Sequence, residues 1–193
     1  RMLGLDARAR LIAVVATLKE QKGHRYLIEA AARVVGRCPD AHFLLIGDGE
    51  LRHALSSQVK ALGLENHVHL LGTRHDLPAL LAACDAVSLH LPLTDATRGL
   101  FDATRLASMK TGAVLVNTAR GGIVDEAALA AALRSGRLGG AALDVFSAEP
   151  LPPTAHFDGC PNLILTPHIA GVTTESNARV SALIADRLLE TLA

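Results

Sequence analysis

The chain has 193 residues with equal numbers of basic and acidic side chains, 19 of each, so its formal net charge is zero. A neutral chain lacks the basic surface that binds nucleic acid or an anionic membrane, and we expect neither partner. Half of the residues are apolar, which is enough to form one hydrophobic core.

The three cysteines, Cys38, Cys84 and Cys160, are far apart and form no CxxC motif. An odd number of separated cysteines is typical of free thiols in a reducing compartment. No apolar run reaches the roughly 18 to 20 residues that a membrane span needs, and no signal peptide opens the chain. We therefore expect a soluble, cytoplasmic protein.

Short apolar runs alternate with amphipathic segments through the first half of the chain. Continuous apolar runs of this length are typical of strands buried on both faces of a parallel sheet. The amphipathic segments between them predict helices that lie on the sheet. The expected strands are 11–15, 42–46, 68–71 and 86–91, and the expected helices are 25–36, 50–62 and 76–84.

The same alternation continues to the end of the chain. It predicts strands at 113–116, 141–145 and 163–166, a helix capped by Asp125, and a long helix that begins at Thr173 or Thr174. Right-handed crossovers then give seven strands in the order 3-2-1-4-5-6-7. We expect a Rossmann-like, doubly wound α/β fold of three layers, formed by one domain over residues 1–193. Its ligands should bind where strands 1 and 4 end.

Glycine is scarce at the turns that could bind a nucleotide. Gly47 and Gly49 follow the second strand, but Arg52 stands where a third glycine of a dinucleotide fingerprint would be. Lys22 is either a solvated turn residue or a phosphate ligand. His67 and His69 alternate onto one face of a strand without a third ligand in view, so we expect packing or solvent exposure and no metal.

The first half contains the phrases ATLKEQKGH (16–24), LLIGDGELR (44–52) and LGLENHVHLLGTRHDLPALLAACD (62–85). They resemble the nucleotide-sugar-binding domain of retaining glycosyltransferases with the GT-B fold. The resemblance implies a nucleotide ligand at Lys22 and Gly23, because the matching Lys contacts the diphosphate. The sugar-binding glutamates of that family are replaced by LPLTDATRGL, so we expect no glycosyltransferase activity.

Three residues with catalytic chemistry follow successive strands of the second half: Arg120, Glu149 and His168. An Arg holds a carboxylate through two parallel hydrogen bonds, and a His removes a hydroxyl proton near neutral pH. A carboxylate beside that His stabilises its protonated form. Taken alone, a His such as His168 is more often a satisfied residue at the end of a strand than a catalytic one. The catalytic hypothesis therefore depends on Arg120, Glu149 and His168 together.

From Asp85 onward the sequence resembles the cofactor domain of D-2-hydroxyacid dehydrogenases. The longest matching phrases are NTARGGIVDEAALAAALRSGRLGGAALDVFSAEPLP (117–152) and LILTPHIAG (163–171). The resemblance implies NAD as cofactor, Arg120 as the substrate clamp, His168 as the acid-base and Glu149 as its partner. It also implies a group of residues around the nicotinamide, namely His90, Pro92, Thr118, Ala119 and Asp144, the last near the carboxamide.

A dehydrogenase of this family begins its cofactor domain with a GxGxxG turn, whereas strand 1 here ends in Ala16-Thr17-Leu18-Lys19. We therefore expect a chimera, engineered rather than a natural fusion, joined near residues 82–85. It would be a scaffold with an incomplete NAD site and inherited, idle catalytic residues. One alternative is an NAD-dependent D-2-hydroxyacid dehydrogenase whose substrate domain comes from another chain.

Two further expectations concern ligands and partners. The second alternative function is a nucleotide-sugar or nucleoside diphosphate binding module that uses Lys22. The carboxyl-end face of the sheet packs against a second domain in both resembled families. Exposed apolar surface of this origin tends to find partners. Self-association as a homodimer through this face and a monomer are therefore both open.

Overall fold

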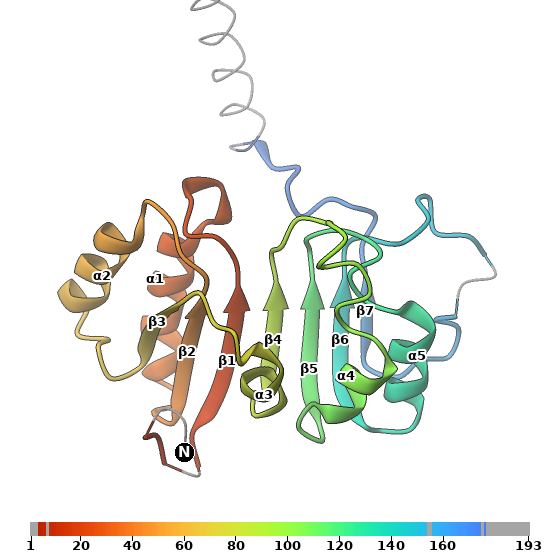
Figure 1. Cartoon of the computed structure of the whole chain (residues 1–193), viewed down its shortest axis with the longest axis horizontal. Helices are drawn as coiled ribbons and strands as arrows, with labels where there is room; N and C mark the ends of the chain where they lie inside the picture. The colour runs from red at the N-terminus through yellow and green to blue at the C-terminus, as the bar shows by residue number, and fades with distance from the viewer. Residues whose placement is uncertain (1–3, 7, 154–155, 175, 177–193) are drawn as a thin grey trace, which may run out of the picture.

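The computed structural model describes residues 4–6, 8–153, 156–174 and 176. Its centre is one sheet of seven parallel strands in the order β3-β2-β1-β4-β5-β6-β7 (Figure 1). The strands are β1 (Arg10–Val15), β2 (Ala41–Ile46), β3 (Val68–Gly72), β4 (Ala86–Leu89), β5 (Ala113–Asn117), β6 (Leu138–Leu143) and β7 (Leu163–Leu165). The predicted Rossmann-like fold and its strand order are confirmed.

Helices alternate with the strands as predicted. They are η1, a 3₁₀ turn (Glu20–Lys22), α1 (His24–Val35), α2 (Arg52–Ala61), α3 (Leu77–Ala82), α4 (Ala103–Ser108) and α5 (Glu126–Arg134). α1 and α2 lie on one face of the sheet, and α3, α4 and α5 on the other (Figure 1). The predicted C-terminal helix from Thr173 or Thr174 lies mostly outside the described residues.

Two apolar cores form on the two faces of the sheet. One joins Ile28 of α1 and Leu55 of α2 to Phe43 and Leu45 of β2. The other joins residues of α3, α4 and α5 to buried residues of β1, β2, β4, β5 and β6, and partly buried Leu71 of β3 and Leu163 of β7 pack against it. Three layers are therefore present where α1 and α2 oppose α3. On β5 and β7, the described helices cover one face, and Ile164 is 65% exposed.

The largest boundary error concerns β6, which starts at Leu138 rather than at 141. Two glycines, a residue type that is depleted in strands, follow Leu138. A Cβ atom added at Gly139 would lie 2.4 Å from the carbonyl oxygen of Gly112. Glycine is therefore required at this position by a close approach of backbone from outside the strand, which no local pattern reveals.

Two aspartates cap helices on the second half of the chain. Asp125 caps α5 as predicted, because its carboxylate accepts a hydrogen bond of 2.9 Å from the N–H of Ala128. Asp102 does the same for α4, with 2.7 Å to the N–H of Arg105. α4 was not predicted, since six residues are too few to show a helical period.

Asp85 connects three central strands at their amino ends. Its backbone N–H bonds the carbonyl of Leu11 at 2.8 Å, and its carbonyl accepts from the N–H of Val114 at 2.9 Å. Its carboxylate accepts from the N–H of Leu11 at 2.9 Å and from Lys110 Nζ at 2.6 Å. The segment where we placed a junction is thus bonded to both halves of the sheet.

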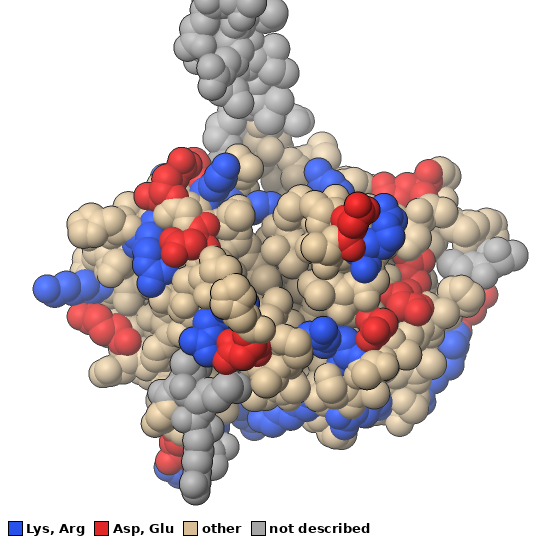
Figure 2. Space-filling model, in the orientation of Figure 1, with Lys and Arg blue, Asp and Glu red and all other residues tan. Residues whose placement is uncertain are grey.

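The surface of the protein carries both signs of charge. Basic and acidic side chains are interspersed over the face shown in Figure 2. Among the helices of the described residues, none combines the length and the apolar character that crossing a bilayer would take.

We predict that Asp85→Ala lowers the free energy of unfolding by about 1–3 kcal/mol, because the Leu11 N–H loses a partly buried acceptor. Asp85→Asn keeps an oxygen for that N–H and should cost less. Urea denaturation measures both.

We further predict that hydrogen exchange on the unmodified chain shows residues 1–84 and 85–193 opening together. Separate opening of the two segments would contradict the expectation that they form one domain.

We also predict that Cys84 does not react with thiol reagents in the folded protein. Burial, reinforced by the charge of Asp85, raises the pKa of the Cys84 thiol to about 12. At pH 8 its thiolate fraction is about a thousandfold below that of a free cysteine. Ellman's reagent should modify half-buried Cys38 and Cys160 first, and equal rates for all three thiols would contradict the burial.

Candidate active site

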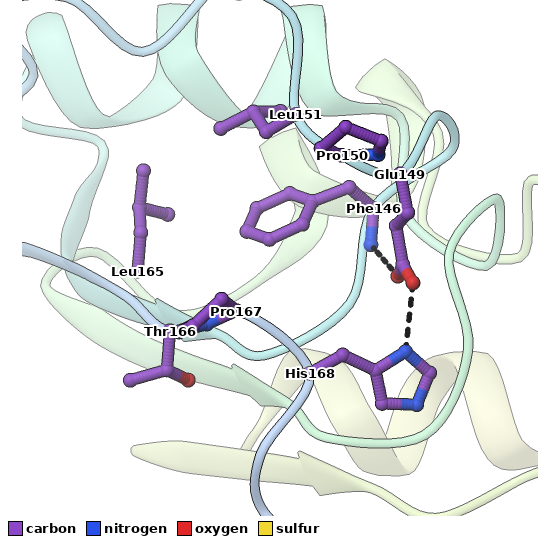
Figure 3. A pocket seen from close by; sticks show the side chains of 8 residues that line it. All are labelled: Phe146, Glu149, Pro150, Leu151, Leu165, Thr166, Pro167 and His168. Atoms are coloured by element: carbon purple, nitrogen blue, oxygen red, sulfur yellow. Dashed lines mark hydrogen bonds and ion pairs between the residues drawn. The ribbon is translucent and has the colours of Figure 1, made fainter.

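His168 and Glu149 form a hydrogen-bonded pair at the carboxyl edge of the sheet. Glu149 follows β6 and His168 follows β7, and 2.7 Å separates His168 Nδ1 from Glu149 Oε2. The pair borders a hollow of about 330 Å³. Figure 3 shows apolar side chains, among them Phe146 and Leu165, on the other side of this hollow. The sequence prediction that these two residues meet is confirmed.

The pair has a defined direction of hydrogen bonding. An ionised carboxylate only accepts, so Nδ1 of His168 carries the proton and Nε2 is left for a ligand. The second oxygen of Glu149 accepts from the N–H of Phe146 at 2.9 Å. The hydrogen bond from His168, and then that from Phe146, lower the pKa of Glu149. Glu149 is therefore an anion at neutral pH.

Asp144 holds the backbone turn on which His168 lies. One carboxylate oxygen accepts from Thr166 Oγ1 at 2.6 Å and from the N–H of Ile169 at 2.8 Å, and the other from the N–H of Ala170 at 2.9 Å. Burial acts to raise the pKa of Asp144, but these hydrogen bonds outweigh it and lower the pKa. Asp144 thus fixes both sides of His168.

This support matters because His168 has an unfavourable backbone conformation. Its φ is 57°, in the left-handed region that non-glycine residues rarely adopt. Such a conformation costs on the order of 1 kcal/mol and persists where surrounding bonds enforce it. Sequence reasoning placed Asp144 near the nicotinamide carboxamide and missed its contacts with the turn, because they join residues 22 to 26 positions apart.

Thr118 shares a second hollow with Asp144. It measures about 390 Å³ and lies between β5, β6 and the turn that carries His168. Thr118 and its neighbour Ala119 follow β5, and the N–H of Ala119 bonds Asn117 Oδ1 at 3.1 Å. The predicted cofactor residues Thr118 and Asp144 are therefore brought together.

Arg120 makes its hydrogen bonds within the turn after β5. Its NH1 donates to the carbonyl of Ala119 at 2.6 Å, and its carbonyl accepts from Asn117 Nδ2 at 3.1 Å. No bond among the described residues joins it to Glu149 or His168. Its charge instead reaches Lys22, whose pKa is lowered by burial and then by Arg120. Among the described residues, the predicted catalytic residues that hydrogen-bond to each other are Glu149 and His168.

His90 and Pro92 follow β4, next to the end of β1. The N–H of His90 donates to the carbonyl of Val15 at 3.0 Å, and 2.8 Å separates His90 Nε2 from Ser88 Oγ. The carbonyl of Pro92 accepts from Thr97 Oγ1 at 2.7 Å. β4 ends at Leu89, so both residues belong to the connection after it.

Sequence reasoning missed His24, which directly follows Lys22 and Gly23. It is the first residue of α1, it is 2% exposed, and neither ring nitrogen has a hydrogen-bond partner. Burial and then the charge of Lys22 lower its pKa. The Lys-Gly-His sequence at a predicted helix start was the available signal. Its meaning depends on burial, which the local sequence does not reveal.

The turn after β1 differs from a glycine-rich dinucleotide turn. The N–H of Leu18 bonds the carbonyl of Asp48 at 3.0 Å, and its carbonyl accepts from the N–H of Leu51 at 3.1 Å. A Cβ atom at Gly47 would lie 2.0 Å from the carbonyl oxygen of Ala16. The turn after β1 is thus bonded to the turn after β2, which lies where a glycine-rich turn would leave room for a ligand.

A group of histidine rings lies on the opposite half of the molecule. His42 stacks on His67 and His69 with ring centroids 5.2 and 5.5 Å away. The sequence did not reveal His42 as a neighbour of the other two, because it lies on β2. Among the described residues, no set of three His, Cys, Asp or Glu side chains is arranged to hold a metal ion.

Comparison with known proteins gives one family over most of the chain. The model of the D-isomer specific 2-hydroxyacid dehydrogenase NAD binding domain matches residues 14–170. This match crosses residues 82–85 without interruption. No comparison supports a glycosyltransferase component, a chimera or an engineered origin, so these expectations are withdrawn.

Individual relatives agree with the family. The (S)-sulfolactate dehydrogenase of Chromohalobacter salexigens is 46% identical over 160 residues, which cover 77% of this chain and 52% of that protein. The D-3-phosphoglycerate dehydrogenase of Haemophilus influenzae is 39% identical over 162 residues, with 76% and 39% covered. The chain thus spans about half or less of the length of these curated relatives.

Solved structures lead to the same family. The crystal structure of a D-isomer specific 2-hydroxyacid dehydrogenase from Xanthobacter autotrophicus Py2, in complex with NADPH and MES, has 34% sequence identity and a TM-score of 0.66. The alignment covers 96% of this chain and 68% of that one. With the fold, the Glu149–His168 pair and the family match in agreement, this chain belongs to the D-isomer specific 2-hydroxyacid dehydrogenase family, in its NAD-binding domain.

Proposed function

We propose that the chain supplies the NAD-binding domain and the acid-base pair of an oxidoreductase that acts on D-2-hydroxyacids or the corresponding 2-oxoacids. The observation that carries the proposal is the 2.7 Å bond between His168 and Glu149 at the carboxyl edge of the sheet. The family match and the names of the relatives support the substrate class.

The arrangement of His168 suits proton transfer. NAD, when bound, would serve as the hydride acceptor. Nε2 of His168 takes the proton of the substrate hydroxyl as oxidation proceeds, and it returns the proton in the reverse direction. Glu149 stabilises the imidazolium ion that forms and keeps Nδ1 protonated, so the proton is exchanged at Nε2.

Arg120 is proposed to bind the carboxylate of the substrate. A guanidinium group has five N–H donors, and one of its nitrogens is engaged with the carbonyl of Ala119. The remaining donors suit a carboxylate, which an Arg binds through two parallel hydrogen bonds. In this proposal Arg120 sets the orientation of the acid, and His168 acts on its hydroxyl.

We predict that the 193-residue chain binds NADH with a dissociation constant on the order of micromolar. Isothermal titration with NADH measures it, and UDP serves as the contrasting ligand. The residues at the ends of β4 to β7 fit the nicotinamide end, so NADH should bind better than UDP. Binding of UDP without binding of NADH would contradict the proposal and favour a nucleoside diphosphate module.

We predict that His168→Gln lowers NADH formation from small D-2-hydroxyacids by about 10²- to 10⁴-fold, because the acid-base group is lost. NADH affinity should stay within about twofold. The matched control is His156→Gln, an exposed His on the same half. A chain that binds NADH but forms none from these acids would restrict the proposal to cofactor binding.

We predict that Asp144→Ala lowers the free energy of unfolding by about 1–3 kcal/mol, because two N–H groups and a hydroxyl lose their acceptor. A lowered pKa means that Asp144 contributes stability above its unfolded pKa of about 3.9 and loses it as the pH falls through the folded value. Urea denaturation at pH 7 and pH 3 should show a smaller difference between variant and parent at pH 3.

A further inference from the structure

Glu126 uses its carboxylate outside its own helix. It is the first residue of α5 and is half-buried, and its Oε1 accepts a hydrogen bond of 2.6 Å from the N–H of Ser147. Hydrogen bonds to an ionised carboxylate are about twice as strong as those between neutral groups. Ser147 lies in the connection after β6, two residues before Glu149. Glu126 thus binds the segment that carries one member of the acid-base pair.

The same peptide group is contacted from a second element. The carbonyl of Phe146 and the N–H of Ser147 belong to one peptide group, and Gly121, in the turn after β5, lies against it. A Cβ atom added at Gly121 would lie 2.7 Å from the nitrogen of Ser147 and still closer to the carbonyl of Phe146. Only glycine leaves room for this backbone. The peptide group therefore has Glu126 as its hydrogen-bond partner and Gly121 as its packing surface.

Phe146 connects these contacts to Glu149. It is 7% exposed, and its ring packs edge-on against Phe157 with centroids 6.3 Å apart. Its N–H donates to Oε1 of Glu149 at 2.9 Å, while Oε2 of Glu149 lies 2.7 Å from Nδ1 of His168 (Figure 3). The peptide group that Glu126 holds and the Glu149–His168 bond are therefore joined through one residue.

Hydrogen bonds hold the segment beyond Phe146. Ser147, Ala148 and Glu149 are exposed, so apolar packing contributes little to their positions. Among the described residues, the N–H of Ser147 has Glu126 as its partner, and the N–H of Ala148 has none. The bond to Glu126 therefore ties the backbone between Phe146 and Glu149 to the body of the domain.

A purely structural role is also open to Glu126. An acidic residue in the first turn of a helix interacts favourably with the helix dipole, and Glu126 occupies that place in α5. This role needs a negative charge, whereas the bond to Ser147 needs an acceptor oxygen. Replacement by Gln keeps an acceptor oxygen and removes the charge. The Gln variant therefore separates the two roles.

We propose that Glu126 is a positioning residue of the acid-base pair: through Ser147 it holds the segment that presents Glu149 to His168. The hydrogen bond that a His ring makes sets which of its nitrogens carries the proton. With Glu149 in place, Nδ1 of the neutral ring carries the proton and Nε2 is free for the substrate. When the segment is released, the Nε2–H tautomer gains population. The consequence for catalysis rests on the proposed function, whereas the tautomer is measured without it.

The test is nitrogen-15 NMR of the full chain with labelled histidine at pH 9, where the imidazole rings are neutral. The signals of His168, assigned with His168→Gln, should show mainly the Nδ1–H form in the unmodified chain. Glu126→Ala should raise the ratio of the Nε2–H to the Nδ1–H form about two- to tenfold, as expected when one hydrogen bond of ordinary strength is lost. Glu126→Gln should restore the ratio to within about twofold of the unmodified chain, because its amide oxygen still accepts.

The matched control is Glu29→Ala, which replaces an exposed Glu on α1 and should leave the ratio unchanged. Urea denaturation verifies that each variant is folded. An unchanged ratio in folded Glu126→Ala would overturn the proposal. A Gln variant that behaves like the Ala variant would also overturn it, because the charge of Glu126 and not its hydrogen bond would then be responsible.

A measurement on the unmodified chain decides if Glu126→Ala does not fold. Hydrogen exchange, corrected for the intrinsic rate of each amide, should be roughly tenfold or more slower at the N–H of Ser147 than at that of Ala148, because a hydrogen-bonded amide must open before it exchanges. Equal corrected rates at the two amides would contradict the role given to Glu126.

Activity separates this inference from the proposed function. If the chain forms NADH from small D-2-hydroxyacids, Glu126→Ala should lower kcat about two- to tenfold and leave KM and the NADH affinity within about twofold. Activity with an unchanged tautomer ratio would overturn the positioning role alone. A changed ratio in a chain that forms no NADH would leave the positioning of Glu149 standing and count against the dehydrogenase proposal.

Discussion

The structure depends on the parallel pairing of β4 with β1. Four residue pairs, from Ile12 with Ala86 to Val15 with Leu89, connect the two halves of the sheet. At the amino ends the carboxylate and backbone of Asp85 tie β1, β4 and β5 together. Because the strands are parallel, this register also brings their carboxyl ends together. All candidate site residues lie in the connections that leave the sheet at this edge.

The polar residues along this edge differ in how they are held. The Glu149–His168 pair is held by a hydrogen bond of 2.7 Å, and Asp144 orders its turn through three hydrogen bonds. His24, by contrast, is buried with no hydrogen-bond partner at either ring nitrogen. A hydrogen-bonded pair of this kind suits repeated proton transfer.

Most of the fold could be predicted because its signals are local. Continuous apolar runs located six of the seven strands to within about two residues at each end, and Asp125 marked the start of α5. β6 was displaced because Gly139 is set by its contact with Gly112, outside the strand. The chimera interpretation failed for a related reason, since phrases that follow one supersecondary pattern recur in unrelated families that share it.

The sequence by itself determined the order of the strands, the edge at which the site lies and the meeting of Glu149 with His168, because these follow from strand periodicity and from the position after each strand. Only the tertiary structure decided that Asp144 holds the His168 turn, that the Arg120 side chain bonds the carbonyl of Ala119, and that His24 is buried without a partner. Those features depend on side chains that are distant in sequence, and on burial, which a local pattern cannot reveal.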